Sequence, residues 1–146
     1  MPTSAETLGI IAPENLEILI VDDDKIIHLL HSRLVTVCKP GHAVTSHLNG
    51  SRALDHIERQ NKPDLFFLVF LDLNMPVMNG WQFLEECRKR GDDNIIVVIV
   101  TSSTSSVDRL RVSDFPQVEA YCEKPFTRNK MLEILDLKVL KPFAAG

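Results

Sequence analysis

The feature that most constrains the fold is an alternation of short apolar runs with segments of helical periodicity. The apolar runs are rich in Val, Ile, Leu and Phe and last six or seven residues, which is the length of a buried strand. They predict strands over residues 16–21, 43–48, 65–71, 94–100 and 118–123. Because strand and helix alternate with short connections, and such crossovers are right-handed, the chain is predicted to form one parallel sheet with helices on both faces.

The segments between the strands carry apolar residues at the spacing of an α-helix. They predict helices over residues 25–38, from about 51, over 80–90, up to about 112 and from 127 onwards. In the first of them the apolar residues form a stripe of the kind that usually packs on a core. This stripe consists of Ile26, Ile27, Leu29, Leu30, Leu34 and Val37.

Composition and charge narrow the function classes. A length of 146 residues suits one domain, and a net charge of −4 without a basic cluster argues against binding nucleic acid. The three cysteines are widely spaced and include no CxxC pair, so neither a disulfide framework nor a zinc site is predicted. No apolar run is long enough to insert into a membrane. We therefore expect a cytoplasmic protein with a leader at 1–14 and a tail at 142–146.

Polar residues follow the strong strands directly at their carboxyl ends. Taken singly, each has a simpler explanation as a helix cap, a first-turn charge or a turn residue. In a parallel sheet, however, the carboxyl ends of all strands meet at one edge, where such folds place their sites. The residues brought to this edge are Asp22, Asp23, Asp24, Asp72, Thr101 and Lys124.

These residue types indicate phosphate chemistry with a metal. Carboxylates placed together repel one another, and a hard divalent cation relieves that repulsion through oxygen ligands. Asp23, Asp72 and a backbone carbonyl near Asn74 suit Mg²⁺. Lys124 and Thr101 supply donors for phosphoryl oxygens. An Asp carboxylate can itself attack phosphorus and form an acyl phosphate.

The residues also resemble the receiver domain of two-component response regulators, of the chemotaxis-regulator type. The resemblance rests on "ILIVDDD", "LDLNMPVMNG", "VIVTSS" and "YCEKPF", which occur in this order and cover residues 16–140. It implies a flavodoxin-like, doubly wound sheet of five parallel strands in the order 2-1-3-4-5. It also implies a receiver domain over residues 15–141. The stretch from Pro63 to Asp72 is longer than is usual in the family, so we expect the third strand either to start late or to carry an extended entry.

The resemblance assigns roles to individual positions. Asp72 would accept the phosphoryl group, and Asn74 would offer its main-chain carbonyl to Mg²⁺ or Mn²⁺ beside the acidic ligands. The other implied roles are metal ligands at Asp22, Asp23 and Asp72, phosphoryl contacts at Thr101 and Lys124, a conformational switch at Thr101 and Tyr121, and a cis Lys124-Pro125 bond. Asp24 is not required by the pattern and is predicted to be a helix N-cap.

The implied partners are a sensor histidine kinase or a histidine phosphotransfer protein, and a downstream protein target. A phosphorylation-dependent dimer is a further implied state. The chain would be a phosphoacceptor rather than an enzyme, with self-phosphorylation and autodephosphorylation at most. Relay to another histidine protein and direct binding of a target both remain open at this point.

Two rival readings of the same residues stay open. A haloacid-dehalogenase-type phosphohydrolase would use Asp22 as nucleophile, since Asp22 to Asp24 contain its D-x-D pattern, but it leaves "LDLNMP" unexplained. A receiver-like scaffold without phosphorylation would not require the complete set of acidic, hydroxyl and lysine residues. His28 and His31 lie at helical spacing and could chelate a metal, although a partly buried role fits them better.

Overall fold

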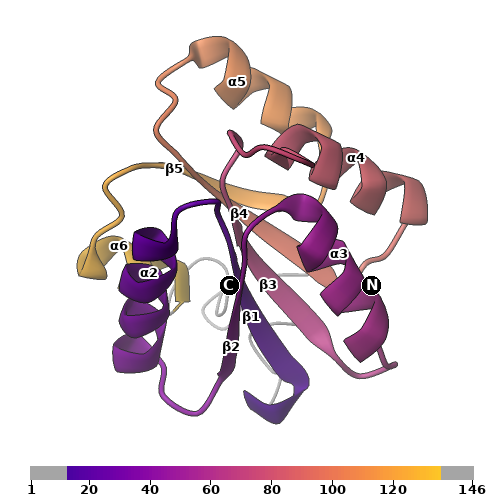
Figure 1. Cartoon of the computed structure of the whole chain (residues 1–146), viewed down its shortest axis with the longest axis vertical. Coiled ribbons are helices and arrows are strands. Elements are labelled where there is room, and N and C mark those ends of the chain that lie inside the picture. The colour runs from indigo at the N-terminus through magenta and orange to yellow at the C-terminus, as the bar shows by residue number, and fades with distance from the viewer. Residues whose placement is uncertain (1–12, 136–146) are drawn as a thin grey trace, which may run out of the picture.

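The five predicted strands form a single parallel sheet in the computed structural model, which describes residues 13–135. Their order is β2-β1-β3-β4-β5, as predicted (Figure 1). The strands are β1 (Leu16–Val21), β2 (Ala43–His47), β3 (Phe66–Leu71), β4 (Ile95–Thr101) and β5 (Val118–Glu123). β3 starts at Phe66, one residue after the predicted start. Most of the predicted leader and all of the predicted tail lie outside the described residues.

Helices cover both faces of the sheet, as the alternation predicted. One side is covered by α2 and α6, and the other by α3 and α4 together with the segment that follows α5 (Figure 1). The helices are α2 (Lys25–Cys38), α3 (Gly50–Gln60), α4 (Gly80–Arg90), α5 (Ser106–Arg111) and α6 (Arg128–Glu133). Two 3₁₀ turns, η1 (Pro13–Asn15) and η2 (Val112–Asp114), precede β1 and follow α5.

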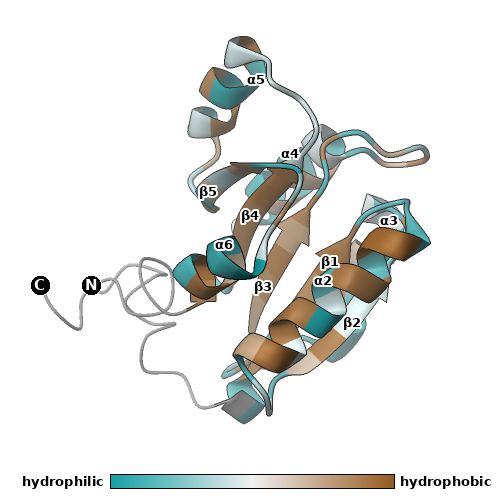
Figure 2. Cartoon of the chain, turned by 90° about the vertical axis from the view of Figure 1, so that its left-hand side faces the viewer, coloured by the Kyte–Doolittle hydropathy of each residue, from teal (hydrophilic) through white to brown (hydrophobic). Residues whose placement is uncertain are grey.

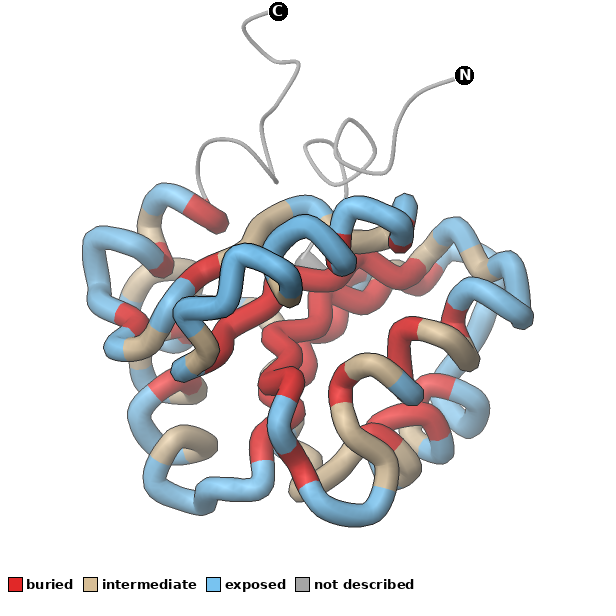
Figure 3. The backbone as a smooth tube through the Cα atoms, turned by 90° about the horizontal axis from the view of Figure 1, so that it is seen from above, coloured by how far each residue is buried: buried red, intermediate tan, exposed pale blue. Residues whose placement is uncertain are grey.

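The sheet is buried on both faces because its side chains alternate between two apolar clusters. In β1, Leu19 and Val21 face the α3–α4 side, whereas Ile18 and Ile20 face the α2–α6 side. The central strands therefore run through the middle of the molecule as buried backbone (Figure 3). Strands buried on both faces read as continuous apolar runs, which explains why β1, β3 and β4 were so evident in the sequence.

The residues at which the helices start and stop are typical capping residues. Asp24 is the N-cap of α2, as predicted, and its carboxylate accepts a hydrogen bond from the Ile26 N–H at 2.9 Å. Asn79 and Gln82 form a reciprocal capping box at the start of α4. Gly91 ends α4 in the left-handed conformation with φ of 68°, which glycine adopts without strain.

Most of the apolar stripe predicted on α2 does not face the core, although Leu34 packs against the α2–α6 cluster, so the prediction is wrong for four of its six residues. Ile26, Leu29, Leu30 and Val37 are exposed, as the outward side of α2 shows in Figure 2. The buried residues of α2 are instead His31 and Val35. The helix carries apolar residues around much of its circumference, so their spacing predicts a helix without deciding which side meets the sheet.

Among residues 13–135, no helix combines the length and hydrophobicity that crossing a lipid bilayer requires. Cys87 and Cys122 are buried free thiols, and Cys38 is a half-buried one.

Candidate functional site

Two aspartates emerge side by side from neighbouring strands. Val21 of β1 pairs with Leu71 of β3, so the residues that follow them, Asp22 and Asp72, leave the sheet at the same level. The strand ladder continues into this region, because the Asp72 N–H donates to the Val21 carbonyl at 2.9 Å. The buried register of β1 and β3 thus fixes the positions of both carboxylates at the carboxyl edge.

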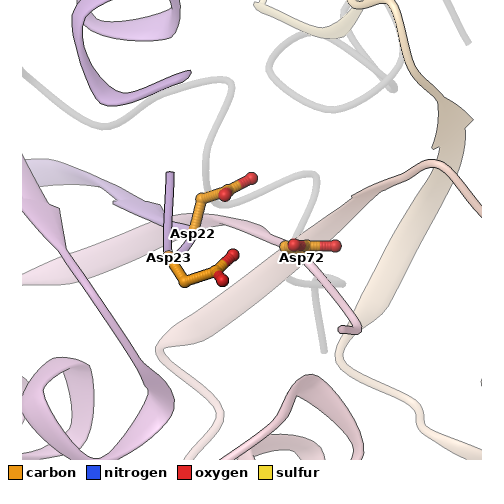
Figure 4. A group of neighbouring side chains, drawn as sticks. All are labelled: Asp22, Asp23 and Asp72. Carbon is orange, nitrogen blue, oxygen red and sulfur yellow. The ribbon is translucent and has the colours of Figure 1, made fainter. Parts of the chain in front are cut away.

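Three carboxylates gather at this edge (Figure 4). One oxygen from each of Asp22, Asp23 and Asp72 lies within 4.8 Å of the others, and this is the group of potential metal ligands found within residues 13–135. Asp22 and Asp72 are 3% and 5% exposed, whereas Asp23 opens to solvent. Such an arrangement offers hard oxygen ligands on one side and leaves access from the other.

Lys124 reaches into the same cluster from the end of β5. Its Nζ lies 2.8 Å from Oδ2 of Asp22 and 3.7 Å from Oδ2 of Asp72. The Lys124 N–H also donates to the carbonyl of Thr101 at 2.7 Å, which ties the ends of β4 and β5 together. The peptide bond between Lys124 and Pro125 is cis, as predicted.

Thr101 ends β4 and is completely buried. Its Oγ1 accepts a hydrogen bond from the Ser103 N–H at 3.2 Å, which fixes the start of the loop after β4. The residues predicted at four strand ends are therefore found on one edge of the sheet. The described structure brings the acids and the lysine into contact, and places Thr101 on the neighbouring strand end.

The carboxylates of the cluster repel one another. Burial and the charge of Asp22 raise the pKa of Asp72 to about 6, although Lys124 and the Asn74 N–H oppose the shift. Burial alone would lower the pKa of Lys124, but its hydrogen bond to Asp22 and the surrounding acids outweigh burial and raise it. A buried carboxylate that resists ionisation beside two others is the situation that a divalent cation relieves.

The segment after Asp72 turns away from the sheet under tight packing. The Asn74 N–H donates to Oδ1 of Asp72 at 3.3 Å, which holds the Asn74 main chain at the site. Gly80 lies against the same turn, since an added Cβ would be 2.6 Å from the Asp72 carbonyl oxygen. Val77 has a φ of 52°, a conformation that a β-branched residue adopts only with strain.

Tyr121 is half-buried on β5, the strand that pairs with the Thr101 strand β4. Its hydroxyl donates to the Ser103 carbonyl at 3.4 Å, so it is linked to the loop that Thr101 begins. The guanidinium of Arg109 lies 4.5 Å above the Tyr121 ring and 3.3 Å from a carboxylate oxygen of Glu123. No sequence pattern indicates a role for Arg109, because its contacts with Tyr121 and Glu123 depend on how α5 packs over β5.

His28 is a second residue that sequence reasoning did not place. Its Nε2 lies 2.5 Å from the Asp22 carbonyl oxygen and 3.1 Å from the His47 carbonyl oxygen. His31, its neighbour one turn along α2, is buried against Phe126 instead. The two histidines therefore make different contacts, and only His28 touches the main chain of the site.

Comparison with known proteins gives a family for this geometry. The family model of the response regulator receiver domain matches residues 18–136. A two-component response regulator from Arabidopsis thaliana is 29% identical over 133 residues, which are 90% of this chain and 89% of that protein. A hybrid signal transduction histidine kinase from Dictyostelium discoideum is 32% identical over 124 residues, or 82% of this chain.

Other relatives are much longer than this chain. The chain spans 7% of the Dictyostelium kinase and 21% of a protein-glutamate methylesterase/protein-glutamine glutaminase from Treponema pallidum, to which it is 39% identical over 89 residues. The receiver thus occurs in proteins whose remaining parts differ widely.

Solved structures show the same fold. A two-component response regulator from Cytophaga hutchinsonii aligns with a TM-score of 0.72 at 23% identity, covering 86% of this chain and 97% of that one. A CheY-like receiver domain protein from Methanospirillum hungatei aligns with a TM-score of 0.68 at 20% identity, covering 89% and 95%. Together with the family match, these comparisons identify the chain as a member of the response regulator receiver domain family of two-component systems.

Proposed function

We propose that the receiver accepts a phosphoryl group on Asp72. The observation that carries this proposal is the convergence of Asp72 with two further acids and with Lys124 at one sheet edge. Receiver domains take phosphoryl groups from phosphohistidine on histidine kinases or phosphotransfer proteins, so a donor of this class is the proposed partner. The family match gives no support to hydrolysis of a phosphate ester by Asp22.

The proposed transfer is a single displacement at the phosphorus atom. An oxygen of ionised Asp72 forms the new O–P bond while the N–P bond of the donor phosphohistidine breaks. The departing imidazole keeps the electron pair and takes a proton, leaving an acyl phosphate on Asp72. Lys124 and Thr101 are proposed to bind phosphoryl oxygens, and this use of Lys124 requires the ammonium to release part of its contact with Asp22.

A divalent cation, Mg²⁺ or Mn²⁺, fits the residues at this site. The proposed ligands are carboxylate oxygens of Asp22, Asp23 and Asp72 and the carbonyl oxygen of Asn74. The fit rests on the oxygen-only donor set, which suits a hard cation, and on the crowding of three carboxylates within 4.8 Å, whose mutual repulsion such a cation would relieve. The bound ion would neutralise charge on the phosphoryl oxygens as they approach the carboxylates.

The proposed output is a change in the contacts of Thr101 and Tyr121. A phosphoryl group on Asp72 offers new acceptor oxygens near the Thr101 hydroxyl, which now accepts from the Ser103 N–H. Movement of this loop would break the Tyr121 contact with the Ser103 carbonyl and free the ring to turn inward. Such a local charge change would shift the population between two conformations of the receiver. A target protein, a relay protein or a second copy of the chain would bind one of these conformations more tightly than the other.

The proposal includes the extent and setting of the receiver. We assign residues 15–141 to it, and a cytoplasmic location follows from the proposed phosphohistidine donor. In this role the chain is a phosphoacceptor rather than an enzyme. A pull-down with phosphorylated and unphosphorylated protein separates the two possible outputs, since a relay protein would leave with the phosphoryl group and a target would remain bound.

The test of the function uses a small phosphodonor. The protein is incubated with acetyl phosphate and Mg²⁺, and its intact mass is measured. One added phosphoryl group is expected, and it should be lost in Asp72→Ala and after metal chelation. Asp64→Ala, which removes an exposed carboxylate before β3, is the matched control and should still be modified. An unmodified wild-type protein, or a modified Asp72→Ala protein, would contradict the assignment.

A further inference from the structure

A basic hollow of about 640 Å³ lies beside the edge strand β2. It is built by residues from α2, the end of β2 and α3. The residues that matter for its charge are Lys25, His28, His47, Arg52, Asp55 and Arg59. The volume falls in the range of small-molecule sites, which is about 300–1,000 Å³. None of these residues has a role in the proposed phosphoryl transfer.

The charges of the hollow differ from those of the whole chain. Lys25, Arg52 and Arg59 face a single carboxylate, Asp55, among the described lining residues, whereas the chain as a whole carries a net charge of −4. Within residues 13–135, none of these three cations forms a salt bridge with a carboxylate, and the Arg59 Nε donates to the Asp55 carbonyl at 3.4 Å. The cations that do form exposed salt bridges are Arg88, Lys89, Arg90, Arg109 and Lys130. An unpaired group of cations around a concavity favours an anionic ligand.

The histidine wall of the hollow adds no permanent charge of its own. The pKa of His47 is lowered to about 4 by burial and then by the neighbouring His56, His28 and Arg59. His47 is therefore neutral at physiological pH, and its ring stacks at a tilt on His56 with centroids 4.7 Å apart. The permanent positive charge of the hollow comes from the lysine and the two arginines.

The histidine wall is held in place before any ligand binds. Both contacts of the His28 Nε2 are carbonyl oxygens, of Asp22 and His47, so this nitrogen carries the hydrogen. The Nε2 of His47 is paired with Oγ1 of Thr45 at 2.9 Å. The long side chains of Arg52 and Arg59 are exposed on α3 and can close on a ligand against this fixed wall.

We propose that this hollow binds a small phosphate compound with at least two negative charges, such as pyrophosphate or a nucleoside diphosphate, through Arg52 and Arg59. Guanidinium groups bind phosphate oxygens in a bidentate fork, which favours phosphate over a singly charged anion. The hollow accommodates a molecule of this size, and the acidic remainder of the chain disfavours a long polyanion. The site is separate from Asp72 and does not depend on the phosphoacceptor proposal.

Isothermal titration calorimetry at low ionic strength tests the site directly. Pyrophosphate and ADP are titrated separately into the full chain without divalent cations, so that the carboxylates around Asp72 repel both ligands. The test variant is Arg52→Gln/Arg59→Gln. The control is Arg33→Gln/Lys62→Gln, which removes the same charge from exposed positions outside the hollow. Circular dichroism checks that both variants fold.

We expect the wild type and the control to bind, and the test variant to bind at least about tenfold more weakly, because it loses both guanidinium groups that would hydrogen-bond the phosphate oxygens. Tighter binding of ADP would assign the site to a nucleotide, and equal or tighter binding of pyrophosphate would assign it to the phosphate groups alone. The absence of binding to the wild type at millimolar ligand overturns the proposal. Equal weakening in both variants also overturns it, as does tighter binding of a hexaglutamate peptide than of pyrophosphate.

Discussion

Replacing Asp72 by Asn is expected to stabilise the fold at neutral pH when no divalent cation is present. The Asp72 carboxylate is 5% exposed and lies within 4.8 Å of carboxylate oxygens of Asp22 and Asp23. Asparagine keeps the shape of the side chain and the oxygen that accepts from the Asn74 N–H at 3.3 Å. The substitution therefore removes the unfavourable charge with little change in packing.

The magnitude follows from the raised pKa of Asp72. A pKa that rises from 3.8 to about 6 on folding means that the folded state binds this proton more tightly than the unfolded state. The ionised carboxylate then destabilises the fold increasingly from about pH 4 to about pH 6, and by a constant amount above that window. At about 1.4 kcal/mol for each pKa unit, its cost reaches at most about 3 kcal/mol. We expect Asp72→Asn to raise the free energy of unfolding by about 1–3 kcal/mol at neutral pH.

Urea unfolding in the presence of a chelator measures this difference. The gain of Asp72→Asn over wild type should be present at neutral pH and should vanish at about pH 4, where Asp72 is protonated in the folded state. Added Mg²⁺ should reduce the gain, because it binds and stabilises the wild type more strongly. Asp64→Asn, at an exposed position, should change stability little. A variant that is no more stable than wild type at neutral pH, or a gain independent of pH, would refute the reasoning.

Three further substitutions test the supports of the site. Val77→Asn should raise the free energy of unfolding by about 1 kcal/mol, because asparagine tolerates the positive φ of 52° better than valine; the midpoint of urea unfolding measures this. Gly80→Ala should lower it by about 3 kcal/mol or more, because the new Cβ would meet the carbonyl oxygen of Asp72 at 2.6 Å, and a normal unfolding midpoint would contradict that contact. Lys124→Met should lower it by about 3 kcal/mol at neutral pH, because it leaves buried Asp22 without its partner at 2.8 Å. Added Mg²⁺ should restore part of that loss in thermal unfolding, and a variant as stable as wild type without metal would count against the ion pair.

The grouping of the site residues was predictable from the sequence, because the residues that follow parallel strands all lie at the same edge of the sheet. The apolar runs of β1, β3 and β4 had to be buried on both faces, and the residue after each strand had to emerge at the carboxyl edge. The pairing of Val21 with Leu71 then places Asp22 level with Asp72, as expected for adjacent strands. Lys124 reaches both acids from the end of β5, although β3 and β4 lie between β1 and β5 in the sheet, because its long side chain spans the gap.

The side of α2 that faces the sheet could not be predicted from its periodicity. Apolar residues surround most of the helix, and the register of α2 on the sheet selects His31 and Val35 for burial while leaving Leu29 and Leu30 exposed. The contacts of His28 were equally hidden, because they join carbonyl groups that only the folded ends of β1 and β2 bring together. Such contacts depend on tertiary geometry and leave no pattern in the sequence.

The most direct measurement of the central claim locates the phosphoryl group itself. Protein phosphorylated with acetyl phosphate and Mg²⁺ is treated with borohydride, which reduces an aspartyl phosphate to homoserine, and its peptides are sequenced by mass spectrometry. The proposed function predicts homoserine at position 72 and unchanged aspartate at positions 22, 23 and 64. Reduction at Asp22 or Asp23 with Asp72 unchanged would contradict the assignment of Asp72 as the phosphoacceptor.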